Sequence, residues 1–344
     1  MMRRAIFYTL LALSILTTGV SCRRNIYKAD IKNVNVSLEV KRLEKDLFTI
    51  NPARLRDSLS YLESRYDGFL KFFGYVINIG EAGDSSWIAG LTSFCTNKGN
   101  NELYQFTLGI FPDIKWIEKD VTEAFRRYHF FFPSKKIPAV YTCITGFNNS
   151  IIVGDSALGI SLDKYLGPDN SFYRRLEVYR YQLAKMNPGN ILPDCIYGWV
   201  STEWSFSGTG YLQNNSLADM IHEGKILFIV KLMMPGIPDD RLFGFTPGQV
   251  KFCRDNEGRM WQYLVEHNLL FSSDMLIRKK LTGEAPFTTY FSSESPGRAA
   301  VWLGFRIVES YMEKNRDITP GMLMDEKDVQ LILEKSRYRP SAGK

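Results

Sequence analysis

Apolar side chains recur at helical spacing along much of the chain. Asn51 is a good helix cap and Pro52 suits a first helical turn. The apolar residues that follow share one helical face: Leu55, Leu59, Leu62, Tyr66 and Phe69. The same spacing predicts further helices over 113–131, 171–186, 193–205, 215–233, 247–270, 297–313 and 325–335.

Two regions have the pattern of strands instead. Residues 34–40 alternate between apolar and polar side chains, which predicts a strand. Three short β-rich runs then follow between turns over 136–166: KIPAVYTCITGF, SIIVGD and ALGISLDKYLG. We therefore expect an α+β fold, mostly α-helical with a small antiparallel β-sheet. No linker or repeat divides residues 51–340, so they are predicted to form a single α-rich globular domain.

The first hydrophobic run has the features of an export signal. Arg3 and Arg4 precede an uncharged, mostly apolar run over residues 5–18, and small residues follow it. Fourteen residues are too few for a spanning helix, which needs about 20. We expect a signal peptide over residues 1–21 and an anchored segment over 22–50.

The Gly-Val-Ser-Cys sequence that ends at Cys22 resembles the lipobox of bacterial lipoproteins. Lipoboxes usually have Leu where this chain has Gly19, although looser versions occur in the Bacteroidetes. The resemblance implies lipidation of Cys22 and attachment to a membrane through acyl chains. An ordinary signal peptide and an uncleaved anchor are the alternatives. Arg23 and Arg24 differ from the acidic residues typical of Bacteroidetes surface lipoproteins, which indicates a protein facing the periplasm.

The composition argues against two classes of function, nucleic-acid binding and histidine-based catalysis. Lys and Arg total 43 against 37 Asp and Glu, and no long basic run occurs, so we expect no nucleic-acid partner. The chain has only three histidines, His129, His222 and His267, which argues against histidine-based catalysis. Aromatic residues are 14% of the chain, so a core or a ligand surface rich in rings is expected.

The remaining cysteines give no metal-binding pattern. Cys95, Cys143, Cys195 and Cys253 are widely spaced and contain no CxxC pair. In an exported protein they can form two disulfides or remain single buried thiols, and the spacing does not distinguish these.

Three motifs stand out along the chain. His222-Glu223 begins like HExxH, but Ile226 stands where the second zinc-binding histidine is required. Gly154–Gly167, with Asp155 and Asp163, fits either a functional rim or the bends of a sheet. The helix after Ser295-Pro296-Gly297-Arg298 contains small residues that permit close helix packing: Ala299, Ala300 and Gly304.

Several motifs together resemble a known family. After the lipobox cysteine come ISLDKYLG (160–167), DNEGRMWQYLVEH (255–267), SPGRAAVWLGFRIVESYM (295–312) and SRYRP (336–340). In this order they resemble the gliding motility lipoprotein GldB family of Bacteroidetes. The resemblance implies a cell-envelope lipoprotein needed for movement over surfaces, although homologues also occur in bacteria that do not glide.

This family also resembles gluzincin-type zinc proteases remotely. In those enzymes a helix with HExxH precedes a second helix whose Glu-Gly pair supplies the third ligand. Glu223-Gly224 resembles the second element, and the HExxH position falls near Asp194–Trp199, which lacks histidine. The resemblance implies a degenerate site with Glu223 and His222 as remnants and with no catalytic residue, metal or cofactor.

The sequence favours a non-enzymatic envelope lipoprotein that holds protein partners and is attached to the membrane by its N-terminal lipid. Two alternatives remain. One is a zinc peptidase using His222 and Glu223, and the other is a module that binds cell-wall glycan.

Overall fold

The structure, a computed structural model, describes residues 26–66, 68–80 and 86–341. The predicted signal peptide and Cys22 lie outside these residues. The strands are β1 (Val40–Arg42), β2 (Ala139–Cys143), β3 (Ile151–Val153) and β4 (Ala157–Ser161). The helices of the first half are α2 (Leu43–Thr49), α3 (Leu59–Tyr66), α4 (Phe69–Val76), α5 (Trp87–Thr96), α6 (Lys98–Ile110) and α7 (Lys115–Phe131).

The helices of the second half are α8 (Arg180–Leu183), α9 (Ile191–Glu203), α10 (Phe206–Thr209), α11 (Ser216–Met233), α12 (Asp239–Phe243), α13 (Pro247–Glu266), α14 (Met275–Thr282), α15 (Ala299–Lys314), α16 (Pro320–Asp325) and α17 (Val329–Ser336). Short 3-10 turns are η1 (Pro52–Arg54), η2 (Leu162–Lys164), η3 (Tyr173–Arg175) and η4 (Pro188–Asn190). The mostly α-helical class with a small sheet is confirmed.

The sheet is mixed rather than antiparallel. Its order is β1-β2-β4-β3, in which β1, β2 and β4 run parallel and only β3 is antiparallel to β4. The expectation of an antiparallel sheet was therefore only partly right. The chain passes from β2 to the outer edge strand β3 and then returns to β4. Strand β4 lies between β3 and β2 and runs parallel to β2.

Predicted and observed elements differ most at two places. Residues 34–40 show the predicted alternation of burial, but only β1 forms a ladder, because the preceding chain runs along α7. There Arg126 Nε donates to the Val36 carbonyl at 2.9 Å. The predicted helix over 171–186 is wrong except for η3 and α8, since this segment buries only Tyr173 and Met186 and has no continuous apolar face.

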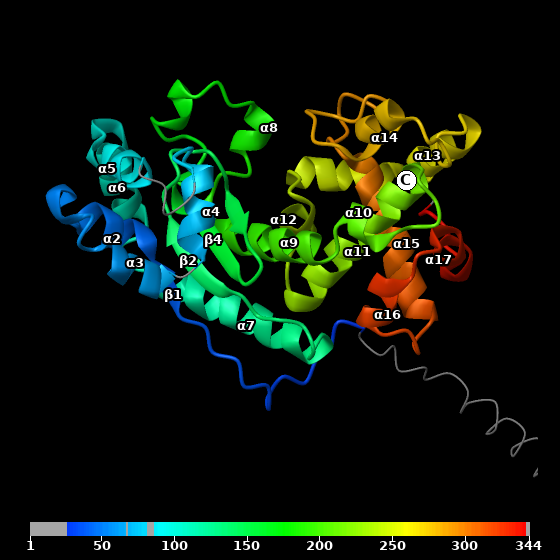
Figure 1. The fold of residues 1–344 in the computed structure, drawn as a ribbon. Coiled ribbons are helices and arrows are strands. Elements are labelled where there is room, and N and C mark those ends of the chain that lie inside the picture. Colours follow the sequence, from blue (N-terminus) through cyan, green and yellow to red (C-terminus); the bar gives the residue numbers. More distant parts are fainter. Residues whose placement is uncertain (1–25, 67, 81–85, 342–344) are drawn as a thin grey trace, which may run out of the picture.

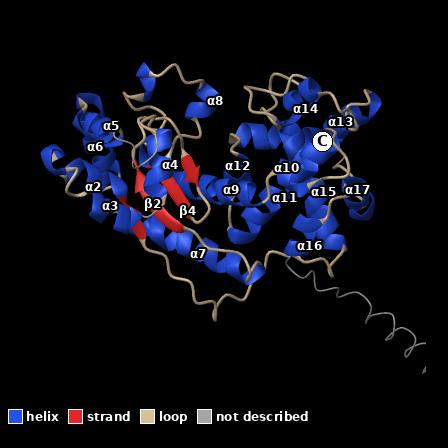
Figure 2. Cartoon of the chain, in the orientation of Figure 1, coloured by secondary structure: helices blue, strands red, loops and turns tan. Residues whose placement is uncertain are grey.

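Two hydrophobic cores lie on opposite faces of the sheet. Neighbouring strand residues point to opposite sides, so Val140 joins one core and Tyr141 the other. Helices α2 to α5 cover the smaller core, and α7, α9, α11, α13, α15 and α17 contribute to the larger. Figure 2 shows the strands confined to one half of the molecule, while the other half consists of helices and loops.

The helical half is organised around α11, which is buried along nearly its whole length. It crosses α15 so closely that a Cβ atom on Gly304 would lie 1.8 Å from the Met220 carbonyl oxygen. A Cβ atom on Gly224 would likewise lie 2.5 Å from the Gly304 backbone. The expectation that small residues permit close packing here is confirmed.

The cysteines and the helix lengths complete the description. The structure has single buried thiols rather than disulfides at Cys95, Cys143, Cys195 and Cys253. Among the residues that the structure describes, no helix is long and apolar enough to span a membrane.

Candidate functional site

A cleft opens between the 180–190 segment and the helical half. It consists of two adjoining cavities of about 410 and 210 Å³. The larger is bounded by α8, η4, the turn between α12 and α13, and the loop 284–297. The smaller reaches the crossing of α9 and α11 and is closed by α12 and α15. Six residues line both cavities, namely Lys185, Asn190, Arg241, Gly244, Phe245 and Glu284.

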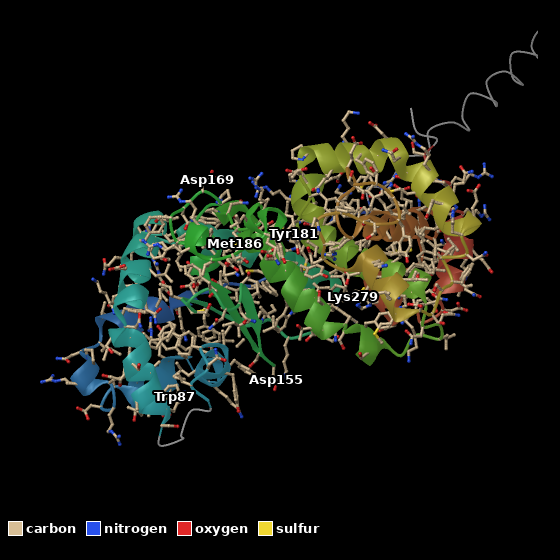
Figure 3. The ribbon with its side chains drawn as sticks, turned by 90° about the horizontal axis from the view of Figure 1, so that it is seen from above. Trp87, Asp155, Asp169, Tyr181, Met186 and Lys279 are labelled. Carbon is tan, nitrogen blue, oxygen red and sulfur yellow. The ribbon has the colours of Figure 1, made fainter. Side chains whose placement is uncertain are left out.

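The figures locate this cleft in the molecule. Figure 1 shows α8 and α14 facing each other across the upper side, with α12 between them. Tyr181, which lines the larger cavity, lies between the two halves when the molecule is seen from above (Figure 3), far from Trp87. The cleft is thus built at the junction of the half that contains the sheet and the helical half.

At the crossing of α9 and α11, Glu223 is bound by two donors. Tyr197 Oη donates to Glu223 Oε2 at 2.8 Å, and Arg298 Nη2 donates to the same oxygen at 2.5 Å. The Arg298 and Glu223 side chains are only 15% and 23% exposed. Burial alone would lower the pKa of the Arg298 guanidinium, but Tyr197 and neighbouring carboxylates outweigh this and raise it. Arg298 therefore keeps a fixed positive charge against Glu223.

The backbone before α15 is shaped to place Arg298. Its φ of +61° lies in the left-handed region, which is costly for a residue with a side chain. The preceding Gly297 fits because a Cβ atom there would lie 2.0 Å from the Ala285 carbonyl oxygen. The Pro-Gly-Arg turn thus directs the guanidinium toward α11.

Glu284 joins the two sides of the cleft. Lys185 Nζ approaches both of its oxygens at 2.9 Å, and Arg298 Nη1 lies 3.0 Å from Oε1. Burial alone would raise the pKa of the Glu284 carboxyl, but the two cations outweigh this and lower it. Together with Glu223, which also pairs with Arg298, the two cations and two carboxylates balance in charge.

Asp194 lies near the start of α9 and lines the smaller cavity. Its Oδ2 accepts a hydrogen bond from Tyr165 Oη at 2.9 Å. Burial raises the pKa of this carboxyl to about 6, although the bond from Tyr165 opposes the shift. Burial thus moves the pKa of Asp194 toward neutral pH.

Arg241 projects from α12 into the same space. Its Nη1 donates to Asn187 Oδ1 and to Asn190 Oδ1, each at 2.7 Å. A Cβ atom on Gly189 would lie 2.6 Å from Nη1, so a larger residue there would displace the guanidinium. The loop around η4 thus forms a fitted seat for the guanidinium.

His222 is directed away from this cleft. Its Nδ1 lies 3.1 Å from Tyr211 Oη, and its ring packs edge-on against Phe206. Burial lowers the pKa of this imidazole. The structure thus brings Glu223 close to the Asp194–Trp199 stretch, as the gluzincin resemblance implies, but separates it from His222.

Across the described residues, no three His, Cys, Asp or Glu side chains are grouped as a metal site requires. Sequence reasoning identified Glu223 and the helix bearing Asp194, but not Lys185, Arg241, Glu284 or Arg298. Only Ser295-Pro296-Gly297-Arg298 carried a local signal, because a Pro-Gly turn before a helix indicates an unusual backbone.

The glycine-rich run 154–167 serves the sheet rather than this cleft. Asp163 is buried and accepts hydrogen bonds from Ser161 Oγ at 2.8 Å and from the Phe147 amide at 2.7 Å. The Thr145 amide is a third donor at 3.3 Å. Of the two interpretations, the structure supports the bends of a sheet.

Comparisons with known proteins complete the picture of the site. The family model described as gliding motility protein GldB matches residues 24–340, nearly the whole chain, so the chain belongs to this family. No curated protein and no solved structure matches it.

Proposed function

We propose that this member of the GldB family is a lipid-anchored envelope protein that binds partner proteins and does not catalyse a reaction. The family match associates the chain with gliding motility. The observation that supports a non-catalytic role is the ion pair of Glu223 with Arg298, which lines the smaller cavity. A carboxylate that ligates zinc or activates water uses its negative charge, whereas the charge of this one is paired with a buried guanidinium.

The N-terminal segment supports a defined orientation. Tyr27 Oη donates to Glu309 Oε1 at 2.6 Å, and Lys231 Nζ lies 3.0 Å from the same oxygen. Tyr27 follows Cys22 by five residues, which reach at most about 17 Å when extended. In Figure 1 the described chain begins beside α16, on the opposite side from α8 and α14. A lipid on Cys22 would therefore hold the cleft away from the membrane.

The test of the non-catalytic role is complementation of a gliding bacterium that lacks its own member of this family. Glu223→Gln keeps an acceptor oxygen for Tyr197 and Arg298 but removes the charge that a zinc peptidase requires. We expect this variant to restore movement as well as the wild-type chain does. Complete loss of movement with normal protein levels would support the peptidase alternative instead.

The anchor is tested separately by fractionating cells. Cys22→Ala should move the protein from the membrane fraction to the soluble fraction, because the acyl chains supply the attachment. Retention of Cys22→Ala in the membrane fraction would contradict the lipid anchor.

A further inference from the structure

Arg241 differs from the other cations at the junction of the two cavities. Lys185 is paired with Glu284, and Arg298 is paired with Glu223 and Glu284. Arg241 forms no ion pair with any carboxylate in the described part of the chain, and its hydrogen bonds to the described residues come from Nη1 alone. Its positive charge and its remaining N–H donors are therefore available to a ligand.

This guanidinium is also held in place before any ligand arrives. Asn187 and Asn190 fix it from one side with neutral oxygens, which orient the charge without cancelling it. Gly189 provides the close approach described above. A fixed, planar fork of N–H donors matches the two oxygens of a carboxylate, and preorganisation lowers the entropic cost of binding.

The surroundings of Arg241 indicate what accompanies that carboxylate. One wall of the smaller cavity is apolar: Pro193, Leu227, Val230, Leu242, Phe243 and Val301. Three carboxylates face the cleft, those of Asp194, Asp240 and Glu284. Of these, Asp194 Oδ1 has no hydrogen-bond donor among the described residues. The cleft thus offers a cation for an anion, an apolar recess and acceptors for N–H groups.

We propose that the cleft binds the C-terminal end of a polypeptide, with the terminal carboxylate on Arg241. The last side chain is apolar and enters the smaller cavity of about 210 Å³. The preceding residues occupy the larger cavity of about 410 Å³, between α8 and the turn after α12. This proposal deepens the binding role above by naming the part of the partner that is recognised.

A peptide end fits this chemistry better than a phosphate group does. The carboxylates around the cleft repel a doubly charged anion, whereas they accept hydrogen bonds from peptide N–H groups. The apolar wall gains nothing from phosphate, but it gains free energy when it covers an aliphatic or aromatic side chain.

The experiment titrates residues 23–344 with two acetylated tripeptides, one ending in Leu and one in Phe, and measures binding by calorimetry. Each peptide is used as the free acid and as the C-terminal amide. We expect the acids to bind and the amides to bind at least about tenfold more weakly, because the amide removes the charge that faces Arg241.

Three variants sharpen the test, each checked for an unchanged thermal transition. Arg241→Gln should weaken binding of the free acids about ten- to a hundredfold, and Arg241→Lys should give an intermediate loss. Arg254→Gln is the matched control, since Arg254 is exposed on α13 and does not line either cavity. It should bind as the wild-type chain does.

Equal affinity for acids and amides would overturn the proposal, as would unchanged binding by Arg241→Gln or no binding of either peptide. Inorganic phosphate that binds at Arg241 as tightly as the free acids would reassign the ligand to a phosphate group. Any of these results with full complementation by Glu223→Gln would refute the peptide site alone and leave the proposed function in place.

Discussion

The contact between α11 and α15 and the cleft beside it use the same two helices in different ways. Where Gly224 and Gly304 meet, the two helices pack backbone against backbone. One residue away on α11, the Glu223 side chain projects toward Tyr197 and Arg298. The contact is filled completely, whereas the cleft contains cavities, a strained Arg298 and a carboxylate with a raised pKa.

This difference separates residues that hold the fold from residues kept for binding. Close-packed backbone leaves no space for change, so substitutions there act on stability. Buried charges and strained backbone cost stability, and such costs concentrate at functional sites. Substitutions in the two regions should therefore have different signatures.

The largest effect is expected from Gly304→Val. The new side chain would occupy the position of the Met220 carbonyl group, so the helices must separate, at a cost of at least about 3 kcal/mol in unfolding free energy. Urea denaturation followed by circular dichroism measures this. Gly109→Ala is the control, because nothing lies within 4 Å of a Cβ atom there, and it should not destabilise the protein. A Gly304→Val protein as stable as the control would contradict the close contact.

The second effect concerns Arg298→Gln. Removing the guanidinium leaves Glu223 without its ion pair, and we expect a loss of about 2 kcal/mol, moderated by partial exposure. In a double-mutant cycle with Glu223→Gln, the double variant should lose less stability than the sum of the two single losses. Fully additive losses would show that the two side chains are not coupled.

The third substitution, Asp194→Asn, is expected to raise the unfolding free energy rather than lower it. The pKa of Asp194 is about 6 in the folded chain, above the value of about 3.9 expected after unfolding, so the folded state binds the proton more tightly. Stability from this group is present below about pH 4 and is lost as the pH rises through 6. Asp194→Asn should therefore stabilise the protein by about 1–2 kcal/mol at pH 7.5 and by nothing at pH 4. A gain independent of pH would contradict this cause.

The smallest effect on stability is expected from Arg241→Gln. This side chain has no ion pair among the described residues and donates only to two amides, so its loss should change the unfolding free energy by no more than about 1 kcal/mol. Thermal denaturation measures this. A loss as large as that of Gly304→Val would mean that Arg241 serves the fold rather than a ligand.

Sequence patterns predicted the fold better than the cleft, for physical reasons. The helices α7, α9, α11, α13 and α15 were predicted because each carries apolar residues at helical spacing or a clear cap. The helices α5, α6 and α14 were not predicted, and the β2–β4 pairing was misjudged because strand direction depends on contacts distant in sequence. The cleft joins Lys185, Arg241, Glu284 and Arg298, and no periodicity reports that such distant residues meet.

The most direct test of the central claim is the metal content of purified residues 23–344, measured by mass spectrometry after exposure to zinc and extensive dialysis. Because Glu223 is paired with Arg298 and His222 contacts Tyr211 instead, we expect zinc far below one atom per chain. Near-stoichiometric zinc that is lost in Glu223→Gln would contradict the binding role and support a metal-dependent peptidase.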